Sequence, residues 1–529
     1  MQGRRIVRTF IGQLTTGLTA GLLLFGFLLA GTSWAQDEKS AAEPATEVAA
    51  STPMPMGDAA PTGDAPAITS SGATVAAPHV SGAYDTGSTT WILVSSALVF
   101  FMMPGLALFY GGMCRAKNVL NMFMCVMVCI PLVCMTWIAY GYSMAFAVPS
   151  AIAIDAGLNE DGTEKPKLSF LGWDSSLVMF KALSDPEPKL KDGTDNPNYY
   201  GKVLTSGDTT GAAPTGVPEL LFAMFQMMFA IITPALIVGA VAERVKFGPW
   251  CLFVVLWATL IYNPVAHWVW NVNGWLFQKG VYDFAGGTVV HVLAGVSALA
   301  LILVLPKRRG YPGGQFVPHS VGWTLMGAGM LMVGWFGFNA GSAIAVGKDF
   351  LPVAGSVAVM AFAATAIAGS MGAGAWMVAE WFVTRKPTAL GVASGMVAGL
   401  VAITPCAGHV SPGGALLIGL IGGVVCFFAV YAKQSIKYDD SLDVVGVHGV
   451  GGALGALLVG WFAVRPAVGS LDQVWLQAQG LLATGAYAFV GTLILGIAIH
   501  KTLGFTVDAA TEDEGLDTKL HGETAYHMN

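Results

Sequence analysis

Long apolar segments recur along the chain from about residue 90 to the C-terminal region, and they constrain the fold more than any other feature. The hydrocarbon core of a bilayer is about 30 Å thick, so a helix needs roughly 20 mostly apolar residues to cross it. Only 11% of the residues are charged, whereas soluble domains contain about 25%. The pattern predicts an all-α polytopic membrane protein with eleven transmembrane helices, at 90–112, 119–147, 218–241, 249–269, 285–305, 319–341, 352–383, 388–405, 413–432, 443–464 and 478–503.

The basic residues between these segments predict how the chain is oriented, because cytoplasmic loops of membrane proteins carry an excess of Lys and Arg. If the N-terminus lies outside, the cytoplasmic loops contain eleven basic residues: Arg115, Lys117, Arg244, Lys246, Lys307, Arg308, Arg309, Arg385, Lys386, Lys433 and Lys437. The short external loops contain three: Lys279, Lys348 and Arg465. The sequence therefore predicts an N-out/C-in topology.

The sequence also divides into predicted regions. Residues 1–35 have the basic start, apolar centre and small-residue end of a secretory signal peptide, with an uncleaved first helix as the alternative. Residues 36–87 are rich in Ala, Pro, Thr and Ser, which predicts a disordered external leader. The membrane domain is predicted at 88–504, including a long external loop at 149–217, and a cytoplasmic tail follows at 505–529.

Two membrane-embedded histidines occupy matching places in this topology. Spans one to five and six to ten form two halves of opposite orientation, with the eleventh span left over, which is the inverted-repeat plan of many transporters. His291 lies in the fifth span and His448 in the tenth. Small residues at four-residue spacing let helices approach closely, and they occur beside both histidines: Gly287, Gly295, Gly452, Ala456 and Gly460. Equivalent helices of the two halves are therefore predicted to bring the two imidazoles together.

The predicted pair suits a path for a small polar molecule. A buried imidazole without a nearby carboxylate is expected to stay neutral, and a neutral imidazole offers one hydrogen-bond donor and one acceptor. Unrelated helix–helix hydrogen bonds are the alternative, but ionisable residues inside membranes are usually functional. Two histidines without a third ligand make a poor zinc site, and none of the seven cysteines has metal-ligand spacing. Neither a metal nor a cofactor is therefore predicted.

Asp283 stands just before the fifth span, at its predicted external end. Because Phe-Ala-Gly-Gly follows, this carboxylate is placed to cap the helix and to add negative potential to an external vestibule. His291 comes eight residues later, about 12 Å along a helix. We therefore expect the carboxylate to favour cations at the entrance and the histidines to act deeper in the membrane.

Aromatic residues gather at the same predicted external end. Phe225 and Phe229 are four residues apart in the third span, Trp270 ends the fourth, and Phe338 and Ser342 are four residues apart at the end of the sixth. Aromatic faces attract cations through their quadrupole, and a hydroxyl adds a hydrogen bond. Each residue alone is typical of a helix core or a membrane interface. Together, around an acidic mouth, they predict a site for a small cation.

The chain resembles the ammonium transporters of the Amt/MEP/Rh family, in particular the bacterial Amt branch, in five motifs: FYGGMCRAKN, ALIVGAVAERVKF, DFAGGTVVH, GWFGFNAGSA and DVVGVHGVGG. The resemblance implies a homotrimer with one pore per subunit that transports ammonium, with methylammonium as an analogue. Carried onto matching positions, it implies recruitment residues Phe225, Trp270, Ser342 and Asp283, gate residues Phe229 and Phe338, and pore residues His291 and His448. In the family, NH₄⁺ loses a proton near the gate and NH₃ crosses an apolar pore, with or without the proton.

The C-terminal stretch DEGLDTKLHGETAY resembles the tail of bacterial Amt proteins, which packs against the cytoplasmic face and takes part in regulation by PII-type signalling proteins. The resemblance thus implies a PII-type partner and a place in the bacterial inner membrane, in contact with lipid, and no role in binding nucleic acid. The sequence departs from the family pattern at two places. The stretch from Trp270 to Asp283 is one residue longer, which is expected to shift Trp270, and the 149–217 loop is long for a bacterial member.

Three other functions are compatible with parts of this pattern. An ammonium sensor would bind its ligand in the vestibule with little or no flux, but the tail after residue 504 has only about 25 residues, which is short for a fused signalling domain and favours transport. A channel for another neutral gas would not need the aromatic and serine recruitment residues. An intramembrane enzyme would need a nucleophile beside the histidines, and the sequence places none there, so no catalytic activity is predicted.

Overall fold

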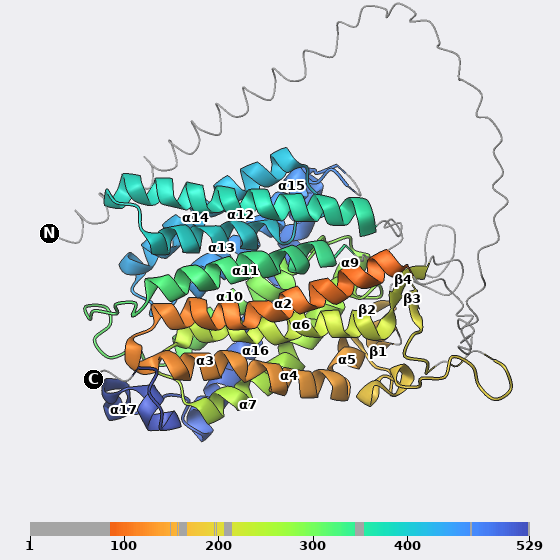
Figure 1. The fold of residues 1–529 in the computed structure, drawn as a ribbon, viewed down its shortest axis with the longest axis horizontal. Helices are drawn as coiled ribbons and strands as arrows, with labels where there is room; N and C mark the ends of the chain where they lie inside the picture. The colour runs from red at the N-terminus through yellow and green to blue at the C-terminus, as the bar shows by residue number, and fades with distance from the viewer. Residues whose placement is uncertain are drawn as a thin grey trace, which may run out of the picture. The chain divides into compact units, whose positions relative to one another are not determined.

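Long helices run side by side in the computed structural model, and two small sheets lie at one end of the bundle (Figure 1). The structure describes residues 85–148, 150–155, 157, 167–194, 196, 198–205, 214–343, 354–465 and 468–526. The predicted signal peptide and nearly all of the predicted leader lie outside the described residues.

Each predicted span corresponds to one helix or to consecutive helical segments. The uninterrupted helices are α2 (Thr86–Met113), α11 (Val321–Gly341), α12 (Ala354–Thr384), α13 (Ala389–Ile403), α14 (Pro412–Ile436) and α16 (Leu471–Thr502). The second span contains α3 (Val119–Met127), α4 (Cys129–Thr136) and α5 (Tyr142–Phe146); Val128 separates the first two, and the π-helical η3 (Trp137–Gly141) joins the last two. The third span contains α6 (Glu219–Ile237) and ends in the 3₁₀-helical η5 (Val238–Val241). The fourth contains α7 (Phe247–Trp257) and α8 (Asn263–Trp270), joined by the π-helical η6 (Ala258–Tyr262). The fifth and tenth begin as π-helical η7 (Gly287–Val292) and η8 (Val445–Val450) and continue as α10 (Leu293–Val304) and α15 (Gly451–Phe462). The short helices α9 (Trp275–Gln278), α17 (Ala509–Glu514) and η9 (Asp517–His521) lie outside the spans.

Within the described residues, ten helices are long and apolar enough to cross a membrane. The eighth predicted span contains α13, whose 15 residues rise only about 22 Å, less than a hydrocarbon core of about 30 Å. This helix ends at Ile403, because Pro405, two residues further on, has no N–H group to donate to the Val401 carbonyl and so cannot continue the helical hydrogen bonds. The all-α polytopic fold is confirmed, whereas eleven crossings and the N-out/C-in topology remain predictions.

Side-chain caps determine where several of these helices begin. A side-chain oxygen accepts a hydrogen bond from a first-turn N–H in α2, α11, α13, α14 and α16, contributed by Asp85, Ser320, Thr388, Ser411 and Ser470, respectively. Such caps satisfy N–H groups that have no partner within the helix. These caps explain where helices begin when hydropathy does not define the first residue. Helix α16, for example, begins at Leu471 rather than at the predicted 478.

The two predicted halves meet along equivalent helices. Helix α2 packs along α11, the first helix of the other half, while α10 contacts η8 and α15 contacts η7. Contacts between equivalent helices are expected for an inverted repeat. The helices come close because of small residues: a Cβ built on Gly327 of α11 would lie only 2.3 Å from the backbone nitrogen of Phe109 in α2.

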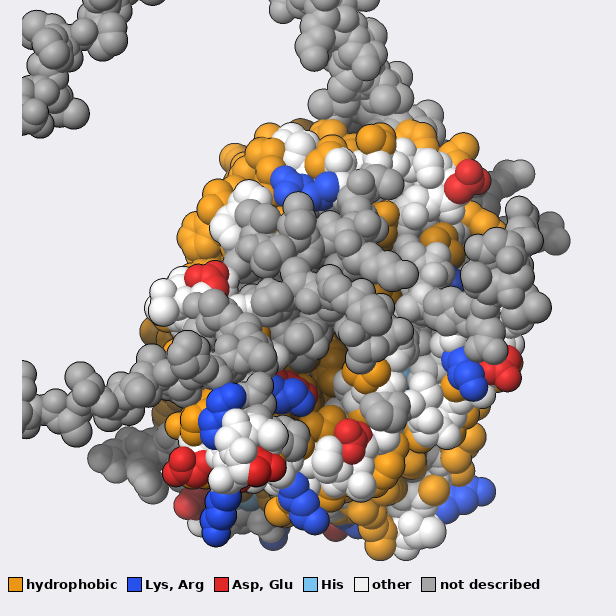
Figure 2. Space-filling model, turned by 90° about the vertical axis from the view of Figure 1, so that its right-hand side faces the viewer, with side chains coloured by type: hydrophobic (Ala, Val, Ile, Leu, Met, Phe, Trp, Pro, Cys, Tyr) orange, Lys and Arg blue, Asp and Glu red, His pale blue; other side chains and the backbone are white. Residues whose placement is uncertain are grey.

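The described part of the predicted external loop contains four short strands. Strand β1 (Ser150–Ile154) pairs antiparallel with β2 (Leu168–Gly172), and β3 (Val203–Thr205) pairs antiparallel with β4 (Pro214–Pro218). The Trp268 indole donates a hydrogen bond to the Phe170 carbonyl at 2.8 Å, which attaches β2 to the end of α8. Figure 2 looks onto this end of the molecule, where charged side chains are scattered over the face and apolar side chains follow its rim.

Candidate functional site

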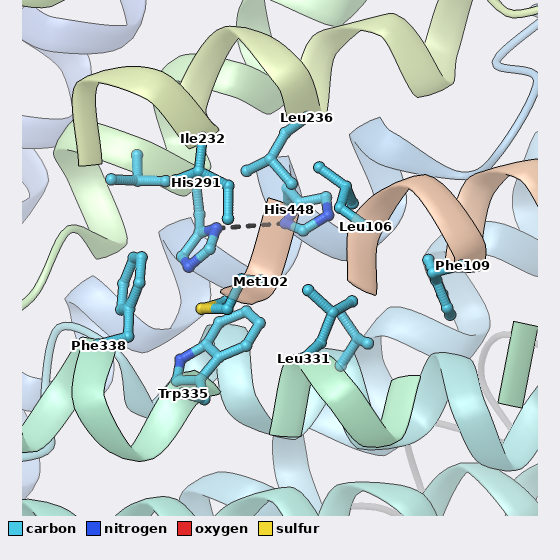
Figure 3. Close-up of a pocket in the computed structure, with 12 residues that line it drawn as sticks. Met102, Leu106, Phe109, Ile232, Leu236, His291, Leu331, Trp335, Phe338 and His448 are labelled. Atoms are coloured by element: carbon cyan, nitrogen blue, oxygen red, sulfur yellow. Dashed lines mark hydrogen bonds between the residues drawn. The ribbon is translucent and has the colours of Figure 1, made fainter. Parts of the chain in front are cut away.

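The two predicted histidines meet between the halves of the fold. His291 lies in η7 and His448 in η8, and their Nδ1 atoms are 3.2 Å apart. The rings are nearly parallel, with centroids 5.2 Å apart and an interplanar angle of 21°. Both side chains are buried, and Figure 3 shows the contact between them. π-Helical turns are rare and occur frequently at functional sites, which agrees with their presence here.

The contact between the two Nδ1 atoms decides how protons are distributed over the pair. A neutral imidazole carries its proton on one nitrogen only, so one ring donates through Nδ1 and the other accepts. The two Nε2 atoms consequently differ, one being a donor and the other an acceptor. The Nε2 atom of His291 is buried and has no hydrogen-bond partner among the described residues. Most buried polar atoms have a hydrogen-bond partner, so this nitrogen is available to a small molecule in the surrounding cavity.

A narrow cavity of about 10 Å³ surrounds the pair, which is room for about one water-sized molecule. Besides the histidines, its lining consists of Met102, Leu106, Phe109, Ile232, Leu236, Val290, Leu331, Trp335, Phe338 and Val397 (Figure 3). The Trp335 ring stacks on His291 with centroids 5.4 Å apart. Because the walls are mostly apolar, an ion would lose its hydration here at a high cost in free energy, whereas a small neutral molecule would lose far less.

Small residues allow the histidine-bearing helices to cross this closely. A Cβ built on Gly295 would lie 2.2 Å from the Cα of Gly449, and one on Gly452 would lie 2.7 Å from the carbonyl oxygen of Gly287. Side chains at these positions would therefore force the two helices apart. Of the small residues predicted beside the histidines, Gly287, Gly295 and Gly452 lie at this contact, whereas Gly460 packs against Val474 of α16.

A second cavity, which we call the vestibule, has a volume of about 120 Å³ and brings together the four residues predicted to recruit substrate: Phe225, Trp270, Asp283 and Ser342. Its other lining residues are Phe146, Phe222, Gln226, Phe229, Val269, Phe277, Val281, Tyr282, Phe284 and His409. The Trp270 indole donates a hydrogen bond to the Asp283 carbonyl at 2.9 Å. The expected shift of Trp270 therefore does not remove it from the vestibule.

Phe229 and Phe338 lie between the two cavities. Phe229 lines the vestibule, and Phe338 lines the cavity around the histidines. Their ring centroids are 4.4 Å apart, and both rings are buried. The Trp270 ring packs edge-on against Phe229 at 5.7 Å. The two phenylalanines therefore form a partition at the place where a gate is expected.

The Asp283 carboxylate caps the histidine-bearing helix. It accepts hydrogen bonds from the backbone N–H groups of Gly286, Thr288 and Val289 at 3.1, 3.0 and 2.9 Å. Burial raises the pKa of Asp283 to about 6, and the hydrogen bonds oppose this rise. The carboxyl is consequently mainly ionised at neutral pH, and its negative charge acts on the vestibule that it lines.

Ser342 supplies an acceptor oxygen to the vestibule. Its hydroxyl donates a hydrogen bond to the Phe338 carbonyl at 2.8 Å. The hydroxyl proton is thereby used within the helix, and the oxygen lone pairs remain available to accept. An acceptor oxygen, aromatic faces and a nearby carboxylate together suit a small cation that carries hydrogen-bond donors.

Asp440 is not among the residues predicted from the sequence. It precedes His448 by eight residues, as Asp283 precedes His291, and it is fully buried. Its carboxylate accepts hydrogen bonds at 3.1 and 2.8 Å from two backbone N–H groups at the start of η8. The repeated spacing of an aspartate eight residues before a membrane-embedded histidine is the signal that would have revealed it.

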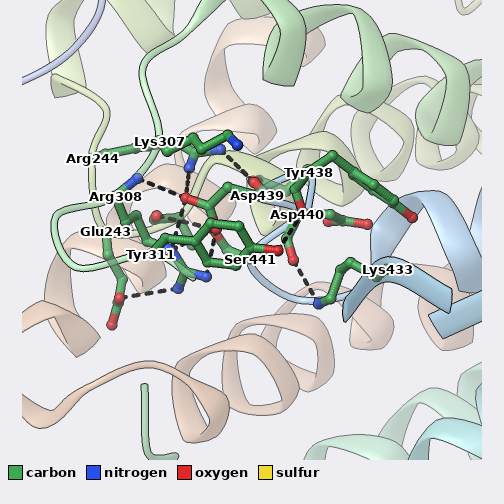
Figure 4. A network of polar contacts seen from close by, with 12 residues as sticks. Glu243, Arg244, Lys307, Arg308, Tyr311, Lys433, Tyr438, Asp439, Asp440 and Ser441 are labelled. Carbon is green, nitrogen blue, oxygen red and sulfur yellow. Dashed lines mark hydrogen bonds and ion pairs between the residues drawn. The ribbon is translucent and has the colours of Figure 1, made fainter. Parts of the chain in front are cut away.

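A network of charged side chains lies next to Asp440, in loops that the sequence predicts to be cytoplasmic (Figure 4). Asp439 pairs with both Arg244 and Arg308. Glu243 pairs with Arg308 at 3.3 Å and with Arg115 at 2.9 Å. Although burial opposes ionisation of Asp439, the two arginines hold its pKa below its usual value. The network therefore links loops from both halves of the fold.

The C-terminal tail packs against the same loops. The Glu512 carboxylate accepts a hydrogen bond from the backbone N–H of Arg309 at 2.7 Å. The Asp517 carboxylate accepts hydrogen bonds from the backbone N–H groups of Leu120 and Asn121 at 3.0 and 2.8 Å. These contacts match the packing that the resemblance to bacterial Amt tails implies.

The cysteines contribute small side chains to the packing. All seven are free, and five of them are buried. Among the described residues, no group of three or more His, Cys, Asp or Glu side chains is arranged to hold a metal ion.

The chain is similar to transport proteins over most of its length. The model of the Ammonium Transporter Family matches residues 90–184 and 190–526. An ammonium transporter of Mycobacterium bovis is 42% identical over 470 residues, which cover 84% of this chain and 91% of the relative. One of Bacillus subtilis is 39% identical over 450 residues, which cover 83% of this chain and 98% of the relative. Among solved structures, Saccharomyces cerevisiae Mep2 is similar with a TM-score of 0.65 and 32% identity, covering 81% of this chain and 88% of that chain.

Proposed function

Because this chain belongs to the ammonium transporter family, we propose that it recruits NH₄⁺ in the vestibule, removes a proton near the two phenylalanines and conducts ammonia past the histidine pair. One observation carries the proposal. Two cavities lie on either side of the Phe229–Phe338 partition, the outer one lined by aromatic faces, a carboxylate and an acceptor oxygen, the inner one apolar apart from its imidazoles and an indole.

In this proposal, recruitment rests on three kinds of contact. The rings of Phe225 and Trp270 offer cation–π attraction, which is worth about 0.5–2 kcal/mol. The Ser342 oxygen accepts a hydrogen bond from the ion, and the ionised Asp283 adds an attractive field. All of these groups line the vestibule.

Deprotonation follows from the difference between the two cavities. An ion that enters the inner cavity of about 10 Å³ gives up its hydration among apolar walls. Neutral ammonia is close to water in size and hydrogen-bonds to the imidazoles, so in this proposal NH₄⁺ transfers one proton to solvent water in the vestibule and passes the partition as NH₃. The two histidines carry their protons on different nitrogens, so one Nε2 atom accepts a hydrogen bond and the other donates one. This arrangement supports passage of ammonia, either alone or followed by its proton.

Flux measurements on reconstituted protein test the proposal and separate it from the sensor alternative. Ammonium or methylammonium pulses are applied to proteoliposomes on a supported membrane while current and internal pH are recorded. Entry of NH₃ raises the internal pH, and entry accompanied by the proton produces a current. A sensor would bind the ion with neither signal, so their joint absence would overturn the transport proposal.

Replacing Trp270 with leucine should raise the ammonium concentration that gives half-maximal flux. Loss of a contact worth about 0.5–2 kcal/mol corresponds to roughly a two- to thirtyfold change. The matched control is Trp381→Leu in α12, where the indole-bearing side chain is exposed. An unchanged half-maximal concentration in Trp270→Leu would count against recruitment at this residue.

The remaining features of the proposal concern assembly and regulation. We propose a homotrimer in the bacterial inner membrane, with eleven crossings, the N-terminus outside, and a PII-type protein bound at the tail-bearing face. The packing of Asp517 and Glu512 against basic loops supports a cytoplasmic place for the tail.

Deleting residues 512–529 should leave basal ammonium flux intact and remove the response to a PII-type protein. The tail contacts a loop and the first turn of α3, and none of its described residues lines either cavity. The measurement compares flux with and without added PII-type protein. Glu514→Ala is the control, because Glu514 is half-exposed and pairs only with Lys519 of the tail itself among the ion pairs of the described residues. Loss of basal flux on deletion would place the tail in the conducting machinery instead.

A further inference from the structure

The end of α8, which bears Trp270, is held by a strand from outside the bundle. Strand β2 of the predicted external loop contacts both α8 and α9, and Figure 1 shows β2 and α9 at the same end of the molecule. The Ser169 backbone N–H donates a hydrogen bond to the Asn273 carbonyl at 3.1 Å. Ser169 and Gly274 also form a parallel β-bridge. The turn between α8 and α9 is thus attached to the edge of this small sheet.

A buried hydrogen bond joins Ser169 to His267, which lies three residues before Trp270 in α8. The His267 Nδ1 atom is 2.9 Å from the Ala145 carbonyl oxygen. A carbonyl can only accept, so Nδ1 carries the proton and Nε2 of the neutral ring is the acceptor. Nε2 lies 2.6 Å from the Ser169 Oγ atom, so the Ser169 hydroxyl donates to it. Both side chains are fully buried, and water cannot readily replace either partner.

A second set of contacts joins β2 to the chain on both sides of Trp270. The Trp268 indole donates a hydrogen bond to the Phe170 carbonyl at 2.8 Å. The Phe170 ring stacks on Trp275, the first residue of α9, with centroids 5.6 Å apart. The Trp268 and Trp275 rings are in contact as well, with centroids 5.8 Å apart. Strand β2 therefore fixes the residues that precede and follow Trp270.

Trp270 depends on this support because it is the last residue of its helix. Asn271, which follows, has an extended backbone, so the helix does not continue beyond Trp270. Within the vestibule, the Trp270 ring has two contacts of its own, the hydrogen bond to the Asp283 carbonyl and the packing against Phe229. Where the ring lies consequently depends both on these contacts and on where β2 holds the end of α8.

We propose that β2 positions the recruitment site: Ser169, through His267, and Phe170, through Trp268, hold the end of α8 so that the Trp270 ring stays in the vestibule. This inference rests on the proposed function, because recruitment by Trp270 belongs to it. A site that is already held in its binding geometry binds more tightly, since less ordering is needed when the ligand arrives. In the described part of the chain, neither cavity is lined by Ser169, His267 or Phe170, so their effect on recruitment passes through another residue.

The test measures ammonium flux through the reconstituted full-length Ser169→Ala variant. This change leaves the buried Nε2 atom of His267 without its donor. It should raise the ammonium concentration at half-maximal flux by roughly two- to tenfold, as the loss of one buried hydrogen bond would, and leave flux at saturating ammonium unchanged. Thr194→Ala is the matched control, because Thr194 is exposed and its hydroxyl donates to Asp192 of the same loop. The control should change neither value.

A double variant separates the positioning of Trp270 from general support of the fold. If Ser169 acts through Trp270, adding Ser169→Ala to Trp270→Leu should change the half-maximal concentration by less than about twofold. Two independent effects would instead multiply. Full multiplication would overturn the inference, and so would an unchanged half-maximal concentration in Ser169→Ala alone.

Trp268→Phe takes the place of Ser169→Ala if that variant does not fold. It removes the indole N–H that donates to the Phe170 carbonyl and keeps an aromatic ring in the same place. The half-maximal concentration should rise, flux at saturating ammonium should stay the same, and Trp270→Leu should again mask the effect. A fall in saturating flux alone would contradict a role in recruitment.

Hydrogen exchange measured by mass spectrometry gives a result that does not depend on transport. Peptides from residues 268–280 should exchange faster in Ser169→Ala than in the wild type or in Thr194→Ala. Equal exchange rates in Ser169→Ala and the wild type would overturn the inference. Absence of wild-type flux would refute the proposed function, while the exchange rates would still show whether β2 holds the end of α8.

Discussion

Replacing His291 with leucine is expected to lower ammonium flux by roughly ten- to a hundredfold. Ammonia in the inner cavity has few polar partners besides the two imidazoles, and losing one hydrogen-bond partner in a buried site costs about 1–3 kcal/mol. Each 1.4 kcal/mol corresponds to about tenfold. His448→Leu should have a similar effect, and the double variant should lose much less than the sum, because the two rings act as one unit.

The measurement is the initial rate of internal alkalinisation after an ammonium pulse, with the protein's elution profile as a check on folding. His500→Leu in α16 is the matched control, because this histidine lines neither cavity. Unchanged flux in both single variants would contradict a role for the pair in conduction. Loss of folded protein in both would show that the Nδ1–Nδ1 contact serves to hold the helices together.

Gly295→Val should prevent the histidine-bearing helices from packing and should cost most of the folded protein. A Cβ at this position would lie 2.2 Å from both the Cα and the nitrogen of Gly449. These are backbone atoms that cannot rotate away, and overpacking of this kind typically costs about 1–3 kcal/mol or more. The change acts on the crossing itself, so stability and flux should fall together.

The measurements for this variant are the yield of monodisperse protein in detergent and its apparent melting temperature. Gly485→Val in α16 is the matched control, because a Cβ there meets no atom within 4 Å. It introduces the same side chain into another transmembrane helix. A Gly295→Val protein as stable as this control would mean that the two helices do not cross at Gly449.

Much of the site could be read from local patterns in the sequence. His291 and His448 stand out because they are ionisable groups in apolar segments, and their small neighbours at four-residue spacing mark the faces on which they lie. Asp283 precedes a helix start, where a carboxylate satisfies free N–H groups. Each of these signals depends on residues close together in the chain, and the structure places all three residues as these patterns require.

Other parts of the candidate site could not be predicted from local patterns in the sequence. The Phe229–Phe338 partition joins residues that are far apart in the chain, and either phenylalanine alone looks like an ordinary residue of a helix core. Asp440 was missed because it lies in a loop between two spans, where an aspartate is unremarkable unless it is compared with Asp283. Lys433 is one of eleven basic loop residues in the sequence, and its ion pair with Asp443 depends on how α14 packs against η8.

The sequence by itself determined that this chain is an all-α polytopic membrane protein, which segments form its apolar helices, and which polar side chains enter these segments. Hydropathy and helical periodicity are properties of residues that are neighbours in the sequence, so they do not depend on how the helices pack. Only the tertiary structure decided which of these side chains meet, how narrow the path around them is, and that Asp440 lies next to a network of ion pairs. Those features depend on the distances between helices, and such distances are set by the shapes of side chains that are remote in the sequence.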